Sequence, residues 1–243
     1  MKNRERADRL LVARGLFESR ARAQAAIAAG RVIADGAPVR KASDEIAPTA
    51  VIEAQAEHPY VSRGAIKLAA ALDEFALDVK DRLCLDVGAS TGGFTEVLLA
   101  RGARHVYAVD VGRGQLHPRL RGRDDITALD QTDIRALDAS RLLQAPDLAT
   151  IDVSFISLKL VVPAVGKLLA ARAQMLALIK PQFEAPRRLI KKGIVRDEVA
   201  HRMICEEIGA FIASRGWRIG GVAASAILGG EGNREFFIAA ERG

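Results

Sequence analysis

Two charged residues that follow apolar segments in the middle of the chain could carry out chemistry together. Asp152 follows Leu-Ala-Thr-Ile, and Lys180 follows Met-Leu-Ala-Leu-Ile and precedes Pro181. Each apolar segment has the length of a buried strand, and Pro181 ends regular structure, so both side chains are expected at the carboxyl edge of a sheet. On adjacent strands they would be neighbours. Such a pair could act on a hydroxyl group, and a buried structural ion pair is the alternative.

A glycine-rich segment earlier in the chain has the composition of a ligand-binding loop. The apolar residues 83–87 lead into Gly-Ala-Ser-Thr-Gly-Gly-Phe-Thr at 88–95. Glycines let backbone approach a ligand, and the first amides of the following helix have no partners within that helix. The spacing Gly-x-x-x-Gly-Gly differs from the Gly-x-Gly-x-x-Gly pattern of dinucleotide binders, so the sequence predicts S-adenosylmethionine as cofactor. The expected contacts are Gly88, Ala89, Ser90, Thr91, Gly92, Gly93, Phe94 and Thr95.

Three further acidic residues lie at the ends of the first three strands expected in this region. Asp86 is expected to support the glycine loop or to receive the methionyl amino group of the cofactor. Asp110 lies 22 residues after Gly88, where a carboxylate can accept hydrogen bonds from ribose hydroxyls. Asp133 follows the third strand and could accept from the adenine amino group. Capping of neighbouring helices is the alternative for Asp110 and Asp133.

The order of apolar segments predicts an α/β fold. Strand-like segments alternate with helical patterns, which indicates a parallel sheet covered on both faces. A helix over 198–215 then precedes two strands, 217–228 and 235–240, whose glycine-rich connection is too short for a parallel crossover, so this pair must be antiparallel. The expected architecture is a Rossmann-like class I methyltransferase with a seven-stranded, mostly parallel sheet and one antiparallel strand. The first five strands are 83–87, 106–109, 126–129, 149–153 and 175–179.

Two short helices and a hairpin form a separate small α+β module at the start of the chain. The helices are expected to end at Gly15 and Gly30, with Ser19 as the cap of the second, and Asp35-Gly36 is the hairpin turn. Residues 1–31 hold eight Lys/Arg against three acids. This concentration suits a polyanionic partner, with a solvated face as the alternative.

This module resembles the S4 RNA-binding domain over roughly residues 4–60. The matching residues are Arg6, Asp8, Leu10, Ser19, Arg20, Ala23, Ile27, Gly30, Val32 and Gly36. In that family the helical pair lies on RNA backbone, which gives affinity rather than base specificity. The resemblance implies RNA contacts from Arg4, Arg6, Arg20, Arg22 and Arg31, and Arg63 is expected to add to them.

The segment 56–62, Ala-Glu-His-Pro-Tyr-Val-Ser, reads as a linker because Pro59 disfavours helix before it. The sequence therefore predicts an S4-like domain over 1–58 and an S-adenosylmethionine-dependent methyltransferase domain over 63–243. A helix is expected to begin after the linker with Ser62 as its cap.

Composition excludes several other classes of protein. A hydrophobic content of 49% in 243 residues is enough for a core. No apolar run approaches the roughly 18 residues of a membrane span and the N-terminus lacks a signal sequence, so a cytoplasmic protein is expected. Cys84 and Cys205 show no metal-ligand spacing, so no metal is expected. The net charge of +6 includes a second basic cluster without acids inside it: Arg113, Arg119, Arg121 and Arg123.

Five segments together resemble the hemolysin A (TlyA-type) ribosomal RNA 2′-O-methyltransferases, which join an S4 domain to a methyltransferase domain of the FtsJ (RrmJ) kind. These segments are 61–68, 86–95, 152–158, 180–184 and 232–237. The resemblance implies a catalytic tetrad of Lys67, Asp152, Lys180 and Glu235 and places the cofactor loop at 88–95. One departure is His-Pro-Tyr-Val at 58–61, where relatives carry an Arg-Ala-Trp-Val type of sequence, so no linker role is carried over.

The implied reaction is methyl transfer to a ribose 2′-hydroxyl of ribosomal RNA, free or in a subunit, at a cytidine. Such a hydroxyl is a weak acid, so the reaction needs in-line geometry and removal of its proton. We expect Lys180 to orient or deprotonate it, Asp152 to hold Lys180, and Lys67 and Glu235 to position the ribose.

Three alternatives remain at this point: a non-catalytic RNA-binding or ribosome-assembly factor, a membrane-active hemolysin and a base methyltransferase. The last is disfavoured because Asp-Val-Ser-Phe at 152–155 stands where base-methylating enzymes carry Asn/Asp-Pro-Pro-Tyr/Phe.

Overall fold

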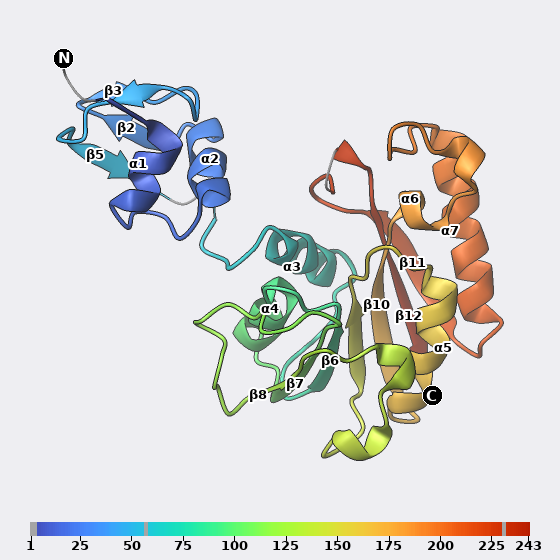
Figure 1. The fold of residues 1–243 in the computed structure, drawn as a ribbon. Coiled ribbons are helices and arrows are strands. Elements are labelled where there is room, and N and C mark those ends of the chain that lie inside the picture. The colour runs from blue at the N-terminus through green and yellow to red at the C-terminus, as the bar shows by residue number, and fades with distance from the viewer. Residues whose placement is uncertain (1–3, 56–57, 230–231) are drawn as a thin grey trace. The chain divides into compact units, whose positions relative to one another are not determined.

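The computed structural model describes residues 4–55, 58–229 and 232–243, and the chain divides into two compact units between Pro59 and Tyr60 (Figure 1). Parts of the predicted linker and of the loop before the last strand, residues 56–57 and 230–231, lie outside these ranges. Residues 58–62 contain no helix or strand. Each unit is described by itself.

The first unit contains the two helices and the hairpin expected from the sequence. The β2–β3 hairpin turns at Asp35 and Gly36, which both have positive φ, and the Ser19 side chain accepts a hydrogen bond from the backbone N–H of Arg22 at the start of α2. Three further strands of two or three residues were not predicted, because segments this short have no periodicity. The elements are β1 Glu5–Arg6, α1 Ala7–Ala13, α2 Arg20–Ala28, β2 Val32–Ala34, β3 Ala37–Pro38, β4 Glu45–Ile46 and β5 Ile52–Ala54.

A buried carboxylate ties the two helices of this unit together. Asp8 of α1 is fully buried and accepts hydrogen bonds from Arg6 at 3.1 Å, Arg20 at 2.7 Å and Gln24 at 2.8 Å. The Arg6 guanidinium, helped by Arg20 and Gln24, holds the pKa of this carboxyl well below its usual range. Two arginines expected to contact RNA are therefore engaged inside the module, although their side chains stay 40% and 50% exposed.

The second unit is built on one sheet with the strand order β11-β12-β10-β9-β6-β7-β8. In the part of the chain that the structure describes, the sheet has seven strands, and β12 alone runs antiparallel to its neighbours, as the sequence predicts. The strand predicted over 217–228 is shorter than expected, since β11 ends at Ala224. The strands are β6 Leu83–Val87, β7 His105–Val109, β8 Ile126–Leu129, β9 Leu148–Ile151, β10 Ala173–Ile179, β11 Arg218–Ala224 and β12 Phe236–Arg242.

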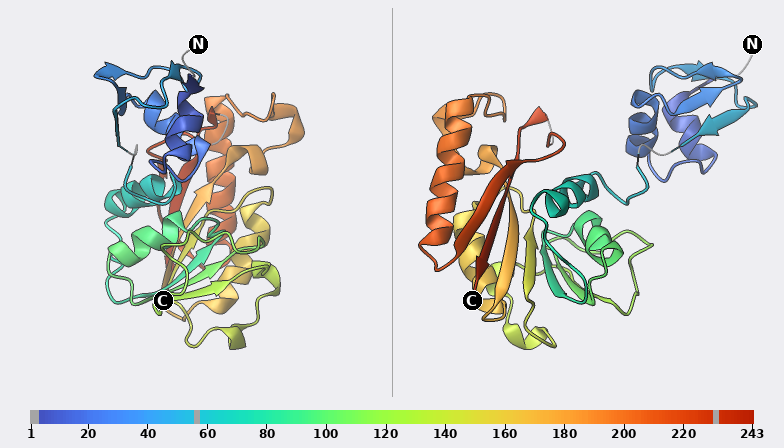
Figure 2. Two further views of the ribbon diagram at one scale, coloured as in Figure 1. Left: turned by 60° about the vertical axis from the view of Figure 1, so that its left-hand side comes forward. Right: turned by 180° about the vertical axis from the view of Figure 1, so that it is seen from behind.

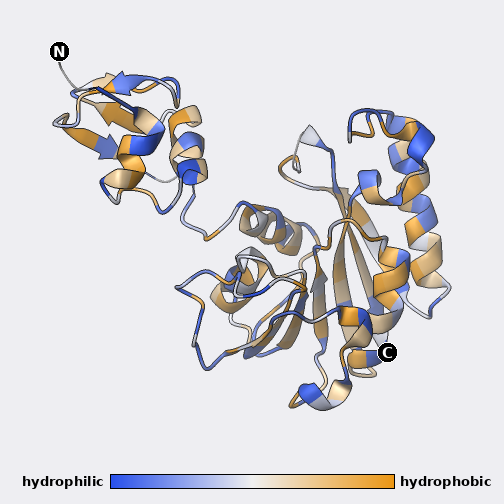
Figure 3. Ribbon diagram, in the orientation of Figure 1, coloured by the Kyte–Doolittle hydropathy of each residue, from blue (hydrophilic) through white to orange (hydrophobic). Residues whose placement is uncertain are grey.

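Helices cover both faces of this sheet (Figures 1 and 2). Alternate strand residues point to opposite faces, so Cys84 packs with helices α3 and α4 while Leu85 packs with α5 and α7. Apolar residues accordingly concentrate on the strands and on the inner sides of the helices (Figure 3). The helices are α3 Gly64–Glu74, α4 Gly93–Ala100, α5 Leu158–Leu168, α6 Pro181–Glu184 and α7 Glu198–Ala213, with short 3-10 turns at η1 Ile134–Ala136, η2 Ala139–Arg141 and η3 Arg187–Leu189.

The prediction that Ser62 caps the first helix of this unit is wrong. Helix α3 begins at Gly64, its N-cap is Arg63 in a helical conformation, and no side chain caps it. The Ser62 hydroxyl instead lies against Gly93, where an added Cβ would come within 2.1 Å of it. Contact with the glycine loop therefore replaces capping at this position.

We predict that Asp8→Asn loosens the first unit in a pH-dependent manner. A lowered carboxyl pKa contributes stability that is present above the unfolded-state pKa near 3.9 and is lost as the pH falls through the folded-state value. At pH 7, hydrogen exchange in α1 and α2 of the whole chain should be about tenfold faster in the variant, and the difference should shrink on acidification. Glu53→Gln, an exposed acid on β5, is the control. Equal hydrogen-exchange protection of α1 and α2 in Asp8→Asn and in the wild type at pH 7 would contradict the stabilising role of Asp8.

Candidate active site

The structure brings Asp152 and Lys180 together, as expected from their positions at the ends of two adjacent predicted strands. Each residue directly follows a strand, β9 for Asp152 and β10 for Lys180, and these two strands are parallel neighbours. Lys180 Nζ lies 2.6 Å from Asp152 Oδ1 and donates to the Ser154 hydroxyl at 2.9 Å. The Lys180 side chain is only 10% exposed. The ammonium group is therefore held in one place at the carboxyl edge of the sheet.

Lys67 and Glu235 form a second ion pair, although 168 residues separate them. Lys67 lies on α3 and Glu235 immediately precedes β12, and Lys67 Nζ lies 2.6 Å from Glu235 Oε2. The two side chains are 11% and 3% exposed. An added Cβ at Gly229 would lie 2.1 Å from Glu235 Oε1, so this glycine leaves room for the carboxylate.

Two cavities meet where these groups lie. The larger, about 1070 Å³, is lined by the expected cofactor residues Asp110 and Asp133, and the smaller, about 360 Å³, is lined by Lys67. Gly88, Ser90 and Asp152 line both. A ligand in the larger cavity and a ligand in the smaller cavity would thus approach each other at Asp152.

The glycine loop contributes to the walls of both cavities. Gly88 has a φ of 85°, and an added Cβ would lie 2.4 Å from the carbonyl oxygen of Asp152, so only glycine lets the loop pass this close to the strand end. Four other residues that we expected to contact the cofactor line the smaller cavity: Ala89, Thr91, Gly93 and Phe94. Gly92, Asp86 and Thr95 do not line either cavity, and Asp86 and Thr95 support the loop, which is one of the two roles expected for Asp86.

Asp86 and Thr95 provide this support from beneath. Both are fully buried, and Asp86 accepts hydrogen bonds from the hydroxyls of Thr95 at 2.6 Å and Thr150 at 3.2 Å. Burial raises the pKa of the Asp86 carboxyl to about 7, against the opposing effect of these hydroxyls. The carboxylate therefore links the first turn of α4 to strands β6 and β9.

Asp110 and Asp133 lie in the larger cavity with different partners. Asp110 accepts from the backbone N–H of Ser90 at 2.8 Å and of Gly112 at 2.7 Å, so its carboxylate is oriented and keeps acceptor capacity for ligand hydroxyls. Asp133 caps η1 and pairs with Arg135 at 2.5 Å, and this arginine lowers the pKa of the Asp133 carboxyl. Asp133 therefore caps a helical turn, as the alternative reading expected, and its side chain also lines the larger cavity.

The larger cavity also has features that sequence reasoning missed. Phe155 has a side chain that is 90% exposed and a φ of 64°, and its ring lies 4.9 Å from that of Phe183. One buried acceptor on this wall, Gln182 Oε1, makes no hydrogen bond within the described residues, whereas Asp152 Oδ1 lies 2.6 Å from Lys180 Nζ. The sequence shows that Phe155 follows Asp152 by three residues, but it does not show that the aromatic ring is exposed.

A cofactor with hydroxyl and amino donors fits this wall. The unused acceptor Gln182 Oε1 would be satisfied by a ligand N–H or O–H group, and Asp110 presents a carboxylate with acceptor capacity left. S-adenosylmethionine carries such donors on its ribose, adenine and methionyl parts. The residues present are therefore compatible with the cofactor that the loop spacing predicts.

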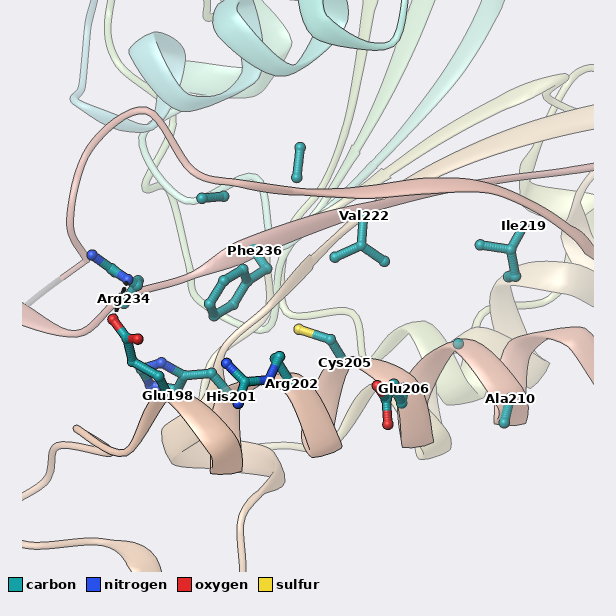
Figure 4. A pocket seen from close by; sticks show the side chains of 13 residues that line it. Glu198, His201, Arg202, Cys205, Glu206, Ala210, Ile219, Val222, Arg234 and Phe236 are labelled. Atoms are coloured by element: carbon teal, nitrogen blue, oxygen red, sulfur yellow. Dashed lines mark hydrogen bonds and ion pairs between the residues drawn. The ribbon is translucent and has the colours of Figure 1, made fainter.

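Outside this region, an apolar cavity of about 640 Å³ lies between α7 and the β11–β12 pair (Figure 4). It contains none of the residues predicted to act. Within the described ranges, no group of three or more His, Cys, Asp or Glu side chains is placed to hold a metal, and no helix is long and apolar enough to cross a membrane.

Comparison with known proteins identifies the family. The model of the FtsJ-like methyltransferase family matches residues 60–242, and the S4 domain model matches residues 5–52. The chain belongs to the FtsJ-like methyltransferase family. The resemblance seen in the sequence is confirmed, and so are a methyltransferase activity and S-adenosylmethionine as its cofactor. RNA is the partner that the S4 domain indicates.

Relatives of this FtsJ-like chain cover nearly all of its length. It is 42% identical over 241 residues to the 16S/23S rRNA (cytidine-2′-O)-methyltransferase TlyA of Mycobacterium tuberculosis, covering 98% of this chain and 90% of the relative. It is 38% identical over 235 residues to Hemolysin A of Brachyspira hyodysenteriae, covering 95% and 97%. A solved structure of a hemolysin-named protein from Streptococcus thermophilus has 41% identity and a TM-score of 0.79, covering 100% and 90%.

We predict that Asp86→Asn changes how stability depends on pH. A raised carboxyl pKa makes the folded state less favourable as the pH rises from the unfolded-state value near 4 to about 7, and a neutral amide removes this loss. The melting temperature of the variant relative to the wild type should increase by about 5 °C between pH 5 and pH 8.

Asp73→Asn is the control, because Asp73 is exposed and pairs with Arg101. The difference in melting temperature between Asp73→Asn and the wild type should be the same at pH 5 and pH 8. An equally constant offset for Asp86→Asn would show that the Asp86 carboxyl is ionised throughout this range.

Proposed function

We propose that this chain transfers a methyl group from S-adenosylmethionine to the 2′-hydroxyl of a cytidine ribose in ribosomal RNA. The observation that carries the proposal is that two ion pairs, Lys180–Asp152 and Lys67–Glu235, border the two cavities. Asp152 lines both cavities and Lys67 lines the smaller one. The TlyA relative is named for the same reaction and substrate. This substrate would place the reaction in the cytoplasm.

The larger cavity holds the cofactor in this proposal. Asp110 accepts hydrogen bonds from its ribose hydroxyls, and Gly88 and Ser90 contact it through backbone. When bound, S-adenosylmethionine supplies a methyl group on a positively charged sulfur. The ion pairs contribute no net charge that would repel this sulfur, because each contains one ammonium and one carboxylate group.

Lys180 acts on the 2′-hydroxyl. Its contacts with Asp152 and Ser154 use two of the three hydrogens of an ammonium group, so one remains to orient the 2′-oxygen for in-line attack. In its neutral form the same nitrogen takes the hydroxyl proton as the new oxygen–carbon bond forms. Asp152 is a positioning residue for Lys180, because its carboxylate, which lines both cavities, holds the Lys180 nitrogen 2.6 Å away.

The smaller cavity receives the target ribose. Lys67 lies on its wall, held by Glu235, and Arg63 at the same cavity offers a cation for an adjacent phosphate. The exposed Phe155 ring on the other side of Asp152 offers a surface on which the target base can stack.

The most direct test of the reaction is mass mapping of ribosomal RNA from cells with and without this protein. We expect one or more additional methyl groups of 14 Da on ribose, at cytidine, in RNA from cells that carry the protein. A methyl group on a base, or no difference between the two RNAs, would contradict the proposal.

Removal of Lys180 separates catalysis from cofactor binding. Lys180→Ala should lower the methylation rate by about 10²–10⁴-fold, because it removes the group that orients or deprotonates the hydroxyl. The dissociation constant for S-adenosylmethionine should change less than about threefold, since Lys180 does not line the larger cavity. Isothermal titration calorimetry and single-turnover methylation measure the two effects.

Lys159→Ala is the matched control, because Lys159 forms an ion pair with Glu207 on the surface. It should retain wild-type rate and affinity. Wild-type turnover by Lys180→Ala would remove Lys180 from the mechanism. Of the alternatives left by the sequence, a non-catalytic factor predicts no cofactor binding by calorimetry, and a membrane-active protein predicts leakage of liposomes.

A further inference from the structure

Residues 187–196, which lie between α6 and α7, carry five exposed basic side chains and no acid. They are Arg187, Arg188, Lys191, Lys192 and Arg196. None of the five forms an ion pair or a side-chain hydrogen bond within the ranges that the structure covers. The nearest acids have other partners. Glu184 accepts from Ser157 and Leu158. Asp197 caps α7 by accepting from the backbone N–H of Val199, and Glu198 pairs with Arg234. None of these five positive charges is therefore paired with a carboxylate of the described residues.

The second basic cluster seen in the sequence differs from this segment. Arg119 pairs with Glu96 at 2.9 Å, and Arg123 pairs with Asp125 at 2.6 Å. Arg121 donates to the carbonyl oxygens of Leu116 and Gly114. Three of the four arginines there thus have partners, either within their own loop or, for Arg119, on α4.

The basic segment has a defined backbone conformation. Lys191 and Ile194 exchange backbone hydrogen bonds of 2.9 and 3.0 Å across a two-residue turn at Lys192 and Gly193, both with positive φ. The buried side chain of Asn233 donates to the carbonyl oxygen of Gly193 at 3.1 Å. A buried ring N–H of His201, on α7 in Figure 4, donates to the carbonyl oxygen of Val195 at 2.8 Å.

These anchors place the segment next to the catalytic groups. Arg187 and Ile190 line the larger cavity beside Asp152, and Asn233 lies two residues before Glu235. One side of the segment therefore borders the cavity assigned to the cofactor. The other side is fixed to the loop that carries a member of the second ion pair.

We propose that residues 187–196 form a phosphate-binding surface of the methyltransferase domain, which holds the RNA strand flanking the target nucleotide. This inference rests on the proposed function. Unpaired Lys and Arg side chains on a fixed backbone bind phosphates without losing partners of their own. The surface acts in addition to the S4 domain and sets the path of the RNA at the site of reaction.

An anionic membrane would require a different surface. A membrane-binding segment presents apolar side chains for insertion beside its charges. Leu189 and Ile190, the large apolar residues between the basic ones, are partly buried instead of fully exposed. The composition of the exposed side therefore favours RNA backbone.

The test variant is R188Q/K191Q/K192Q, which removes three charges that line neither cavity of the active site. The matched control is R172Q/K80Q/K167Q. It removes one arginine and two lysines that are exposed at the opposite edge of the sheet, near the starts of strands β6 and β10 and the end of α5. Both triple variants have the same net charge.

Binding of a fluorescent ribosomal RNA fragment is measured as a function of salt concentration, together with methylation kinetics. We expect the R188Q/K191Q/K192Q variant to raise the Kd and the KM for RNA about tenfold at low salt and to lower the slope of log K against log salt by about 3. The control should lower the slope by less than about 1. Affinity for S-adenosylmethionine should be unchanged in both.

Equal RNA affinity and salt slope in the two triple variants would overturn the phosphate-binding surface. A loss of binding to phosphatidylglycerol vesicles with unchanged RNA affinity would also overturn it, in favour of a membrane contact. If the wild type binds RNA but does not methylate it, the proposed function fails while the binding data still decide the role of the segment. If the triple variant unfolds, K191Q/K192Q at the exposed turn replaces it, with K80Q/K167Q as its control.

Discussion

The contact between Lys180 and Asp152 is the interaction on which the site depends. Both groups are removed from most of the surrounding water, and a charge in such a position is costly unless a partner of opposite sign lies within reach. Parallel pairing of β9 with β10 supplies that partner, because it brings the ends of two strands to the same edge. The Lys67–Glu235 pair solves the same problem with a helix and the antiparallel strand β12.

Close backbone approaches keep these charges at a common point. Without a side chain at Gly88, the cofactor loop passes against the carbonyl group of Asp152, and without one at Gly229 the Glu235 carboxylate reaches Lys67. The buried Asp86 carboxylate holds the loop from below through two threonine hydroxyls. The site is thus an arrangement of strand ends and loops whose positions are set by backbone contacts as much as by the ion pairs themselves.

The sequence predicts the parts of this site that follow from the order of the strands and from charged residues at their ends. Asp152 and Lys180 could be placed as neighbours because alternating elements imply adjacent parallel strands, and the short final connection implies the antiparallel β12. The pairing of Lys67 with Glu235 came only from family resemblance, since no local pattern links residues so far apart. Other features depend on tertiary contacts that sequence periodicity does not encode. These are the contact of Ser62 with Gly93, the binding of Arg6 and Arg20 by Asp8, and the absence of ion-pair partners for the basic side chains at 187–196.

A double-mutant cycle between Asp152 and Lys180, read by single-turnover methylation of ribosomal RNA at saturating cofactor, tests the central claim most directly. If Asp152 acts through Lys180, adding Asp152→Asn to Lys180→Ala should lower the rate less than about threefold beyond Lys180→Ala alone, although Asp152→Asn by itself lowers it by about 10² or more. Multiplicative losses, with the double variant as slow as the product of both effects, would mean that the two groups act independently and would contradict the account.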